Sequence, residues 1–311
     1  MYGSRSKWVK ASRAYWALFV GACWALAAPA VFAQMVAVSE PVAIEKVPDL
    51  VYYDGDGYHP GKHCLDLYRP DIRHMAELGA PMRPVLVFVH GGGWMFGDKN
   101  HYGGLYGNIG RAFAERGYLV AVINYRLSSR RRGDVRHPEH VRDVARAVAW
   151  IGKNVASYGG DPRRMVVAGH SAGGHLVSLL ATDPRFLSEV GLDRSAFRGV
   201  VSISGVYDVV GIPGITSAFG DDDAERKLAS PIFQVDASDA TLPYLLIVAE
   251  NDLPGLDGGA RDFARELRGV DAKVELEKIE DCSHQSIVIA IGRDGDVTTE
   301  RVATFLREAL D

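Results

Sequence analysis

The stretch MVVAGHSAGGHLVSLL, residues 165–180, decides the fold. Its apolar start, 165–168, predicts a buried strand, and the apolar run from Ala172 to Leu180 predicts a helix. Between them lies Gly-His-Ser-Ala-Gly, 169–173, which has the pattern G-x-S-x-G. A serine at such a sharp strand-to-helix turn has an exposed hydroxyl, and the glycines leave room for neighbouring backbone. Ser171 is therefore the candidate nucleophile.

A second glycine-rich segment suits such a nucleophile. Val85–Val89 is continuously apolar, which predicts a central parallel strand, and His-Gly-Gly-Gly-Trp follows it at 90–94. Glycines at the carboxyl end of a buried strand leave backbone N–H groups free to face a substrate oxygen. The residue after the serine opens a helix, so its N–H group is also free. The backbone amides of Gly92, Gly93 and Ala172 are therefore the candidate oxyanion hole.

A nucleophilic serine also needs a base, and the base needs an orienting carboxylate. Asp252 follows the predicted strand Leu245–Ala249, and His284 follows the predicted strand Lys273–Ile279. In folds built around the G-x-S-x-G turn, the chain order is serine, acid, histidine. Asp252 and His284 therefore complete a candidate triad with Ser171, in which the histidine takes the serine proton and the carboxylate orients the imidazole.

Other residues of the same types offer alternatives for two of these roles. Asp208 and Glu250 also follow predicted strands, so either could serve as the acid. His170 lies inside the serine turn and His175 on the next helix, where packing or hydrogen bonding is the ordinary role. His90 begins the glycine run and is expected to shape that loop rather than to take the proton.

Strands and helices alternate along the chain. This alternation predicts an α/β fold with a mostly parallel, doubly wound sheet flanked by helices. Residues 51–311 are expected to form a single catalytic domain, behind an extended lead-in at 34–50. Further strands are predicted at 119–123 and 199–204, and helices at 139–158, 261–268 and 298–310.

Three segments of this domain need separate interpretation. Residues 51–54 and 64–68 predict two short strands joined by a glycine-bearing turn. The second strand alternates apolar and polar residues, which indicates an edge strand with one wet face. Residues 209–240 have no clear periodicity and could cover the pocket.

The first 33 residues differ from the rest. Four basic residues precede an uncharged apolar run, Ala14–Ala33, that ends in small residues around Phe32. This pattern predicts a signal peptide over residues 1–33, cleaved after Ala33, and hence an exported protein, periplasmic or secreted. The run is just long enough to span a bilayer, so an uncleaved membrane anchor is the alternative.

Composition indicates the size of the core and which partners the protein can bind. The chain has 311 residues, 47% of them hydrophobic, which is enough for one large core. Its formal net charge is −4, without a basic stripe or interleaved aromatic residues, so no nucleic-acid partner is expected.

Two cysteines, Cys64 and Cys282, would remain after signal cleavage. They could form a disulfide in an oxidising compartment or stay free, and both interpretations are open.

No motif predicts a metal or a cofactor. His59 and His63 are four residues apart, but Pro60 and Gly61 between them prevent a shared helix face. The glycines at 90–94 do not belong to a G-x-G-x-x-G pattern, and no Lys-Ser/Thr pair follows them. They therefore do not predict a phosphate site.

Several longer motifs occur together in this chain: HGGGW at 90–94, YGGDPRRMVVAGHSAGGHL at 158–176, SGVYDV at 204–209, the Ser230-Pro231 pair, and the late Asp252 and His284. Together they resemble the α/β-hydrolase esterases over residues 50–310. Within that group the chain is similar to bacterial carboxylesterases and acetyl- or feruloyl-esterase-like enzymes, with arylformamidases and prenylcysteine methylesterases nearby. One departure is Ala249, where such relatives often have glycine.

The resemblance implies the α/β-hydrolase fold and supports the triad and oxyanion residues named above. It implies a serine hydrolase that cleaves carboxylic esters of small molecules, with short acyl chains, through an acyl-enzyme and without a cofactor. The alternatives are an arylformamidase-type amidase, a serine peptidase, or a hydrolase-fold binding module without catalysis. No membrane contact is expected once the signal peptide is removed.

Overall fold

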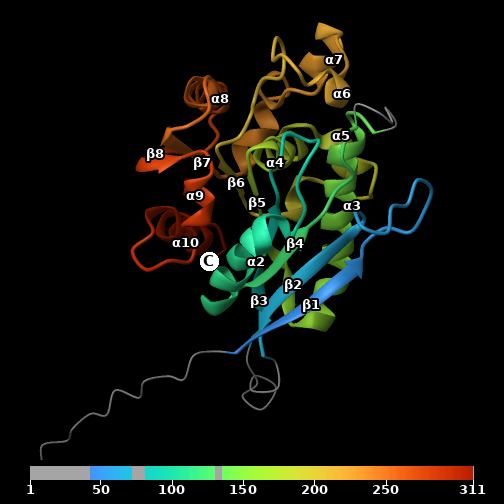
Figure 1. The fold of residues 1–311 in the computed structure, drawn as a ribbon, viewed down its shortest axis with the longest axis vertical. Coiled ribbons are helices and arrows are strands. Elements are labelled where there is room, and N and C mark those ends of the chain that lie inside the picture. The colour runs from blue at the N-terminus through green and yellow to red at the C-terminus, as the bar shows by residue number, and fades with distance from the viewer. Residues whose placement is uncertain (1–42, 72–80, 130–134, 311) are drawn as a thin grey trace, which may run out of the picture. The chain divides into compact units, whose positions relative to one another are not determined.

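An eight-stranded sheet runs through the protein in the order β1-β2-β4-β3-β5-β6-β7-β8 (Figure 1). The computed structural model describes residues 43–71, 81–129 and 135–310. The strands from β4 to β8 along this order are parallel, whereas β1 and β2 are antiparallel additions at one end. The strands are β1 (Ile44–Val51), β2 (Cys64–Pro70), β3 (Arg83–Val89), β4 (Leu119–Ile123), β5 (Gly160–His170), β6 (Val200–Ile203), β7 (Tyr244–Asn251) and β8 (Val274–Ser283).

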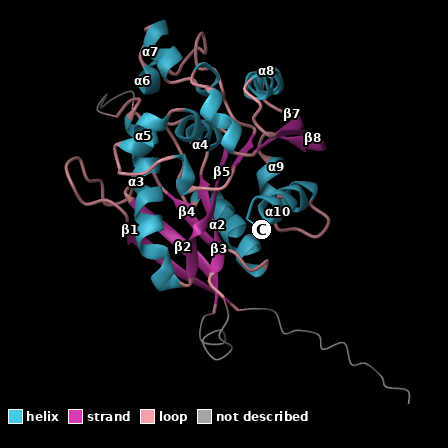
Figure 2. Cartoon of the chain, turned by 180° about the vertical axis from the view of Figure 1, so that it is seen from behind, coloured by secondary structure: helices cyan, strands magenta, loops and turns pink. Residues whose placement is uncertain are grey.

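Helices cover both faces of this sheet (Figure 2). One face carries α2 (His101–Glu115), α9 (Ser286–Ile289) and α10 (Val297–Leu310). The other carries α3 (Glu139–Asn154), α4 (Ala172–Thr182) and α8 (Leu256–Gly269). The other described helices are α5 (Pro184–Ser188), α6 (Thr216–Phe219) and α7 (Asp223–Leu228), with 3-10 turns at Val155–Tyr158, Arg194–Ala196, Pro231–Phe233 and Ala237–Thr241.

Two hydrophobic cores result, one on each face of the sheet. Along β3, Val87 and Val89 point into the core beneath α3 and α4, while Leu86 and Phe88 point into the core beneath α2 and α10. Successive side chains of a strand face opposite sides, so a strand covered on both faces must be apolar at every position. The predicted mostly parallel, doubly wound α/β sheet is therefore confirmed.

The predicted strand at 51–54 is wrong. The first strand among the described residues is β1, which ends at Val51 and begins inside the predicted lead-in at 34–50. Its sequence, IEKVPDLV, mixes charged residues and a proline, so it shows no strand periodicity. Pairing with β2 holds it in place, helped by an ion pair of 2.7 Å between Lys46 Nζ and the Asp66 carboxylate.

The wet face predicted for the segment 64–68 is also wrong, because every residue of β2 is buried. β1 covers its outer edge, and α2 packs on one face, where a side chain at Gly110 would meet the Tyr68 ring at 2.5 Å. The polar residue of the alternation, Asp66, is neutralised inside the protein by Lys99, whose Nζ lies 2.7 Å away. The alternation therefore came from a buried ion pair and not from solvent.

Cys64 and Cys282 are both free thiols. Cys64 begins β2 and Cys282 lies near the end of β8, and five strands separate β2 from β8 in the sheet. At about 4.8 Å per strand, this distance far exceeds the roughly 4.4–6.8 Å between the Cα atoms of a disulfide. The structure therefore resolves the open question in favour of free thiols.

Two segments remain, the predicted signal peptide and residues 209–240. The predicted signal peptide, residues 1–33, lies outside the described residues. Among the helices that are described, none is long and apolar enough to cross a membrane. The segment 209–240, which lacks periodicity, contains α6, α7 and two 3-10 turns.

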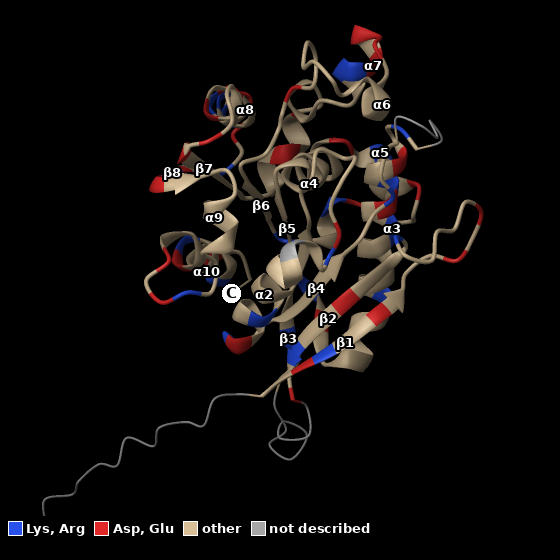
Figure 3. Cartoon of the chain, viewed as in Figure 1, with Lys and Arg blue, Asp and Glu red and all other residues tan. Residues whose placement is uncertain are grey.

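Positively and negatively charged residues both occur along α3, α7 and α8 (Figure 3). On α3, Arg142 pairs with Glu139 at 2.9 Å and with Glu189 at 2.8 Å. Residues of opposite charge thus lie beside one another at α3, and neither sign is confined to one of these three helices.

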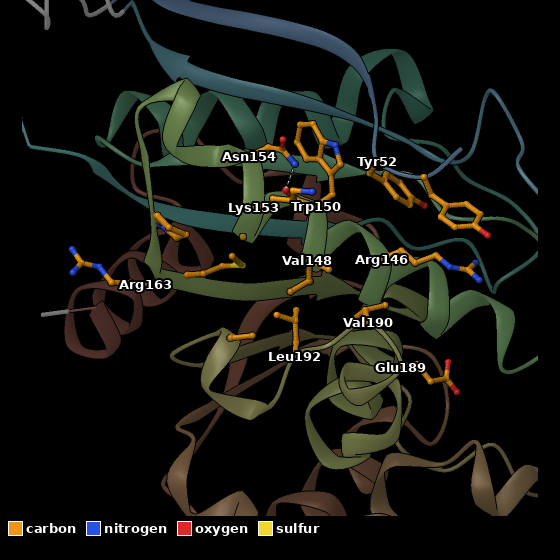
Figure 4. A pocket seen from close by; sticks show the side chains of 16 residues that line it. Tyr52, Arg146, Val148, Trp150, Lys153, Asn154, Arg163, Glu189, Val190 and Leu192 are labelled. Carbon is orange, nitrogen blue, oxygen red and sulfur yellow. Dashed lines mark hydrogen bonds between the residues drawn. The ribbon is translucent and has the colours of Figure 1, made fainter. Parts of the chain in front are cut away.

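A groove of about 1000 Å³ lies against α3 and the beginning of β5 (Figure 4). Trp150 and Lys153 of α3 line it, together with Arg163 and Met165 of β5. Ser171 follows the opposite, carboxyl end of the same strand. Because α/β sheets bind their ligands at the carboxyl ends of the strands, this groove is separate from the candidate active site.

Candidate active site

The turn between β5 and α4 holds Ser171 in a backbone conformation that residues with side chains rarely adopt, with φ of 55° and ψ of −117°. Two flanking glycines allow this turn. A Cβ atom on Gly169 would lie 2.3 Å from the backbone of Gly173, and one on Gly173 would lie 2.1 Å from the Val89 carbonyl oxygen. The G-x-S-x-G pattern is thus explained by backbone crowding, and the serine side chain is held clear of the turn.

The structure brings the three predicted triad residues together. His284 Nε2 lies 3.0 Å from Ser171 Oγ, and His284 Nδ1 lies 2.6 Å from Asp252 Oδ1. They come from the carboxyl ends of β5, β7 and β8, which parallel pairing places at one edge of the sheet. Both spacings are within hydrogen-bonding distance, so one imidazole bridges a hydroxyl and a carboxylate.

The Asp252 carboxylate is held by donors on both oxygens. Oδ1 accepts from His284 Nδ1 and the Leu253 amide, and Oδ2 accepts from the Ser204 hydroxyl at 2.6 Å and the Ala249 amide at 3.0 Å. Burial alone would raise the pKa of Asp252, but the hydrogen bonds from His284, Ser204 and the two amides lower it to about 2. The carboxylate therefore stays ionised beside the imidazole.

Ser204 is a site residue that the sequence analysis missed. It follows β6 directly and has a positive φ of 49°, which turns its hydroxyl toward Asp252. The only signal was its position in the SGVYDV motif, at the carboxyl end of a predicted strand. Because this contact joins loops after two different strands, no local pattern reveals it.

The alternative acids are engaged elsewhere. Asp208 accepts from the Val210 amide at 2.8 Å and from the Ser230 hydroxyl at 3.3 Å, so it fastens the start of the 209–240 segment. Glu250 accepts from the Asp281 amide at 2.9 Å. Neither takes the position beside His284 that Asp252 occupies.

The glycine run after β3 folds into a tight loop, in which Gly92 and Gly93 have φ values of 120° and 58°. A side chain on Gly92 would collide with the Phe96 carbonyl oxygen at 2.1 Å. Within the described parts of the chain, the amide N–H groups of Gly92, Gly93 and Ala172 donate to no acceptor. These three amides are therefore available to an oxygen of a bound molecule.

Two of the alternative histidines shape this loop. His90 is buried, which lowers its pKa to about 4, and its Nδ1 lies 2.7 Å from the Gly91 carbonyl oxygen. His175 is also buried, with its pKa lowered to about 3, and accepts at 3.1 Å from the Trp94 indole. Its other nitrogen lies 2.7 Å from the Ala229 carbonyl oxygen, so the 209–240 segment is connected to the glycine loop.

This sheet, with a serine on a strained turn and an acid and a base after later strands, has the architecture of the α/β-hydrolase fold. The chain belongs to the BD-FAE family, whose model matches residues 65–253. That match includes Ser171 and Asp252 but ends before His284, which the structure supplies from β8.

Comparisons with other proteins agree with this fold. The chain is similar to "Esterase LipQ" of Mycobacterium tuberculosis, with 30% identity over 270 residues, covering 80% of this chain and 60% of that protein. "Esterase LipC" of the same organism is 31% identical over 258 residues, covering 76% and 61%. The solved "Truncated form of carbohydrate esterase from gut microbiota" matches with a TM-score of 0.67 and 18% identity, covering 87% and 98%. The chain thus spans about three-fifths of the length of these two curated relatives.

Proposed function

We propose that this protein hydrolyses carboxylic esters of small molecules with short acyl chains, by a serine acyl-enzyme mechanism. The observation that carries the proposal is the alignment of Ser171 Oγ, the His284 imidazole and the Asp252 carboxylate at 3.0 and 2.6 Å. The esterase names of LipQ and LipC support the choice of an ester over other acyl compounds.

The geometry assigns a role to each group. With Nδ1–H donated to Asp252, the imidazole presents a lone pair at Nε2 and takes the proton as Ser171 attacks the carbonyl carbon. The amides of Gly92, Gly93 and Ala172 would receive the oxyanion. His284 then returns the proton to the leaving alcohol, and water, activated by the same imidazole, releases the acid from the acyl-enzyme.

The test is hydrolysis of p-nitrophenyl esters from acetyl to dodecanoyl by the protein and by its Ser171→Ala variant. Activity is expected to peak at the short chains and to fall by about 10³-fold or more in the variant, because the triad acts as a unit. Near-full activity in the variant would refute the assignment of Ser171. A folded protein that hydrolyses none of the esters would refute ester hydrolysis itself.

We also propose that the protein is exported, into the periplasm or the medium, after cleavage behind Ala33. The support is the order of four basic residues, an uncharged apolar run and small residues at the cut site. An uncleaved membrane anchor would give a different N-terminus and a different fraction of the cell, which separates the two outcomes.

A further inference from the structure

A chain of buried hydrogen bonds connects the glycine loop with the loop that carries His284. The Gly91 amide donates to the Tyr106 hydroxyl oxygen at 3.0 Å, and the hydroxyl lies 3.1 Å from His170 Nδ1. His170 Nε2 lies 2.9 Å from the main-chain carbonyl oxygen of His284. Tyr106 comes from α2 and His170 from the last position of β5, so the chain spans segments far apart in the sequence.

The donor and the acceptor of each of these hydrogen bonds can be assigned. The His284 carbonyl can only accept, so the hydrogen of His170 is on Nε2 and its Nδ1 is an acceptor. The Tyr106 hydroxyl must then donate to Nδ1, which leaves its oxygen to accept from the Gly91 amide. Each of the three hydrogen bonds therefore has a defined donor and acceptor, and together they run from the glycine loop to the loop that carries His284.

His170 is built into this position. It is only 5% exposed, and its ring lies 4.8 Å from the ring of His284, centroid to centroid. Burial, followed by the proximity of His284, lowers the pKa of His170 to about 3. A neutral ring is what the chain of hydrogen bonds requires, because a proton on Nδ1 would remove the acceptor for Tyr106.

Gly91 shows how closely the glycine loop packs on this pair. A Cβ atom there would lie 3.0 Å from His170 Nδ1 and 3.1 Å from the Tyr106 hydroxyl oxygen. The next two residues, Gly92 and Gly93, carry candidate oxyanion amides. Any displacement of the pair would therefore move the amides on one side and His284 on the other.

We propose that Tyr106 and His170 are positioning residues that hold the oxyanion amides and the His284 imidazole in register around Ser171. This inference rests on the proposed serine mechanism and adds to it two buried residues. It predicts that their loss lowers the rate of the chemical step and leaves substrate binding nearly unchanged.

The experiment compares Tyr106→Phe, which removes only the hydroxyl, with Tyr244→Phe as the matched control. The Tyr244 hydroxyl is also buried and hydrogen-bonded, at 2.8 Å to Asp239, but it lies at the amino end of β7. We expect kcat to fall roughly tenfold in Tyr106→Phe with KM changed less than about twofold. The control is expected to lose similar thermal stability and to keep its kcat.

Variants of His170 test whether the bonds act as one chain. His170→Gln keeps an N–H donor for the His284 carbonyl, whereas His170→Leu keeps neither bond, so kcat should fall further in the leucine variant. Combining Tyr106→Phe with His170→Leu should cost little more than His170→Leu alone, because both changes break the same connection. Additive losses, or equal losses in the glutamine and leucine variants, would overturn the proposal.

The rate at which a fluorophosphonate labels Ser171 gives a second readout that does not depend on finding the right ester. If the wild type hydrolyses esters and Tyr106→Phe matches it in both kcat and labelling rate, the positioning role is refuted while ester hydrolysis stands. If no ester is cleaved but labelling slows about tenfold in Tyr106→Phe, the positioning role stands and the ester assignment is refuted. A wild type that is neither labelled nor able to cleave an ester would overturn both.

Discussion

The Asp252 carboxylate shows how single hydrogen bonds determine the chemistry of a residue. Two side chains and two amides donate to it, and these bonds more than offset the effect of burial on its pKa. An ionised carboxylate fixes the hydrogen of His284 on Nδ1, which leaves Nε2 free to accept from Ser171. The protonation state of one residue thus decides whether its neighbour can act as a base.

The same shift predicts a pH dependence of stability. The pKa of Asp252 is about 2 in the folded protein, against an ordinary value of 3.8. The ionised carboxylate therefore stabilises the folded protein fully at pH values above its ordinary pKa of 3.8. This stabilisation is lost as the pH falls through about 2. Asp252→Asn should unfold at lower urea concentration than the wild type near neutral pH, and the two midpoints should converge in acid.

The control for this measurement is Asp262→Asn, which removes an exposed carboxylate paired with Arg265 on α8. Exposed ion pairs contribute little to stability, so this variant should follow the wild type at every pH. If the urea midpoints of Asp252→Asn and the wild type differed by the same amount at every pH down to about 2, the ionised Asp252 carboxylate would not be the source of the stability.

At the scale of an element, the strand–turn–helix unit of β5 and α4 depends on where its glycines stand. Gly173 is the second residue of α4 and lies against the end of β3, where no Cβ atom fits. Gly152 lies in α3 with no atom within 4 Å of the position that a Cβ would take. The two helical glycines therefore should respond to alanine in opposite ways.

We predict that Gly173→Ala destabilises the protein by several kcal/mol and abolishes hydrolysis, because the Val89 backbone cannot retreat without shifting β3. Gly152→Ala should instead stabilise it by about 0.5–1 kcal/mol, since alanine favours the helix and meets no neighbour. Urea unfolding of both variants measures this. A destabilised Gly152→Ala would show that the helix surface is more crowded than it is in the structure.

Elements that could be predicted from sequence are those whose local pattern matches their surroundings. β3 and β4 are covered on both faces, and their apolar runs predicted them within two residues. β1 escaped prediction because β2 and the Asp66 carboxylate hold it, neither of which appears in its own sequence. Asp66 in β2 led to the wrong prediction of a wet face, because its partner Lys99 lies elsewhere in the sequence.

The candidate site divides in the same way. The G-x-S-x-G pattern nominated Ser171, and chain order and strand ends then nominated Asp252 and His284. Ser204 and Tyr106 act through contacts between segments 48 and 64 residues apart in the chain. Such contacts exist only once the sheet has assembled, and no spacing in the sequence announces them.

At the scale of the whole molecule, the proposed export predicts a defined mature chain. Expressed with its own N-terminus, the protein should appear outside the cytoplasm and begin at Gln34, as N-terminal sequencing of the exported protein would show. Replacing the basic residues before Ala14 by glutamine should slow export, because they orient the apolar run. Full-length protein retained in the membrane fraction would instead identify the segment as an anchor.

The two end strands of the sheet have a consequence for behaviour at high concentration. β1 and β8 stand at the ends of the strand order, where unpaired backbone groups could template another chain. β1 carries Lys46 and Pro48, and β8 carries Glu275 and Glu277, both paired at 2.8 Å with Arg301. Adding a strand from a second molecule would bury these charges and meet a proline, so the native sheet is protected against edge-to-edge aggregation and fibril growth.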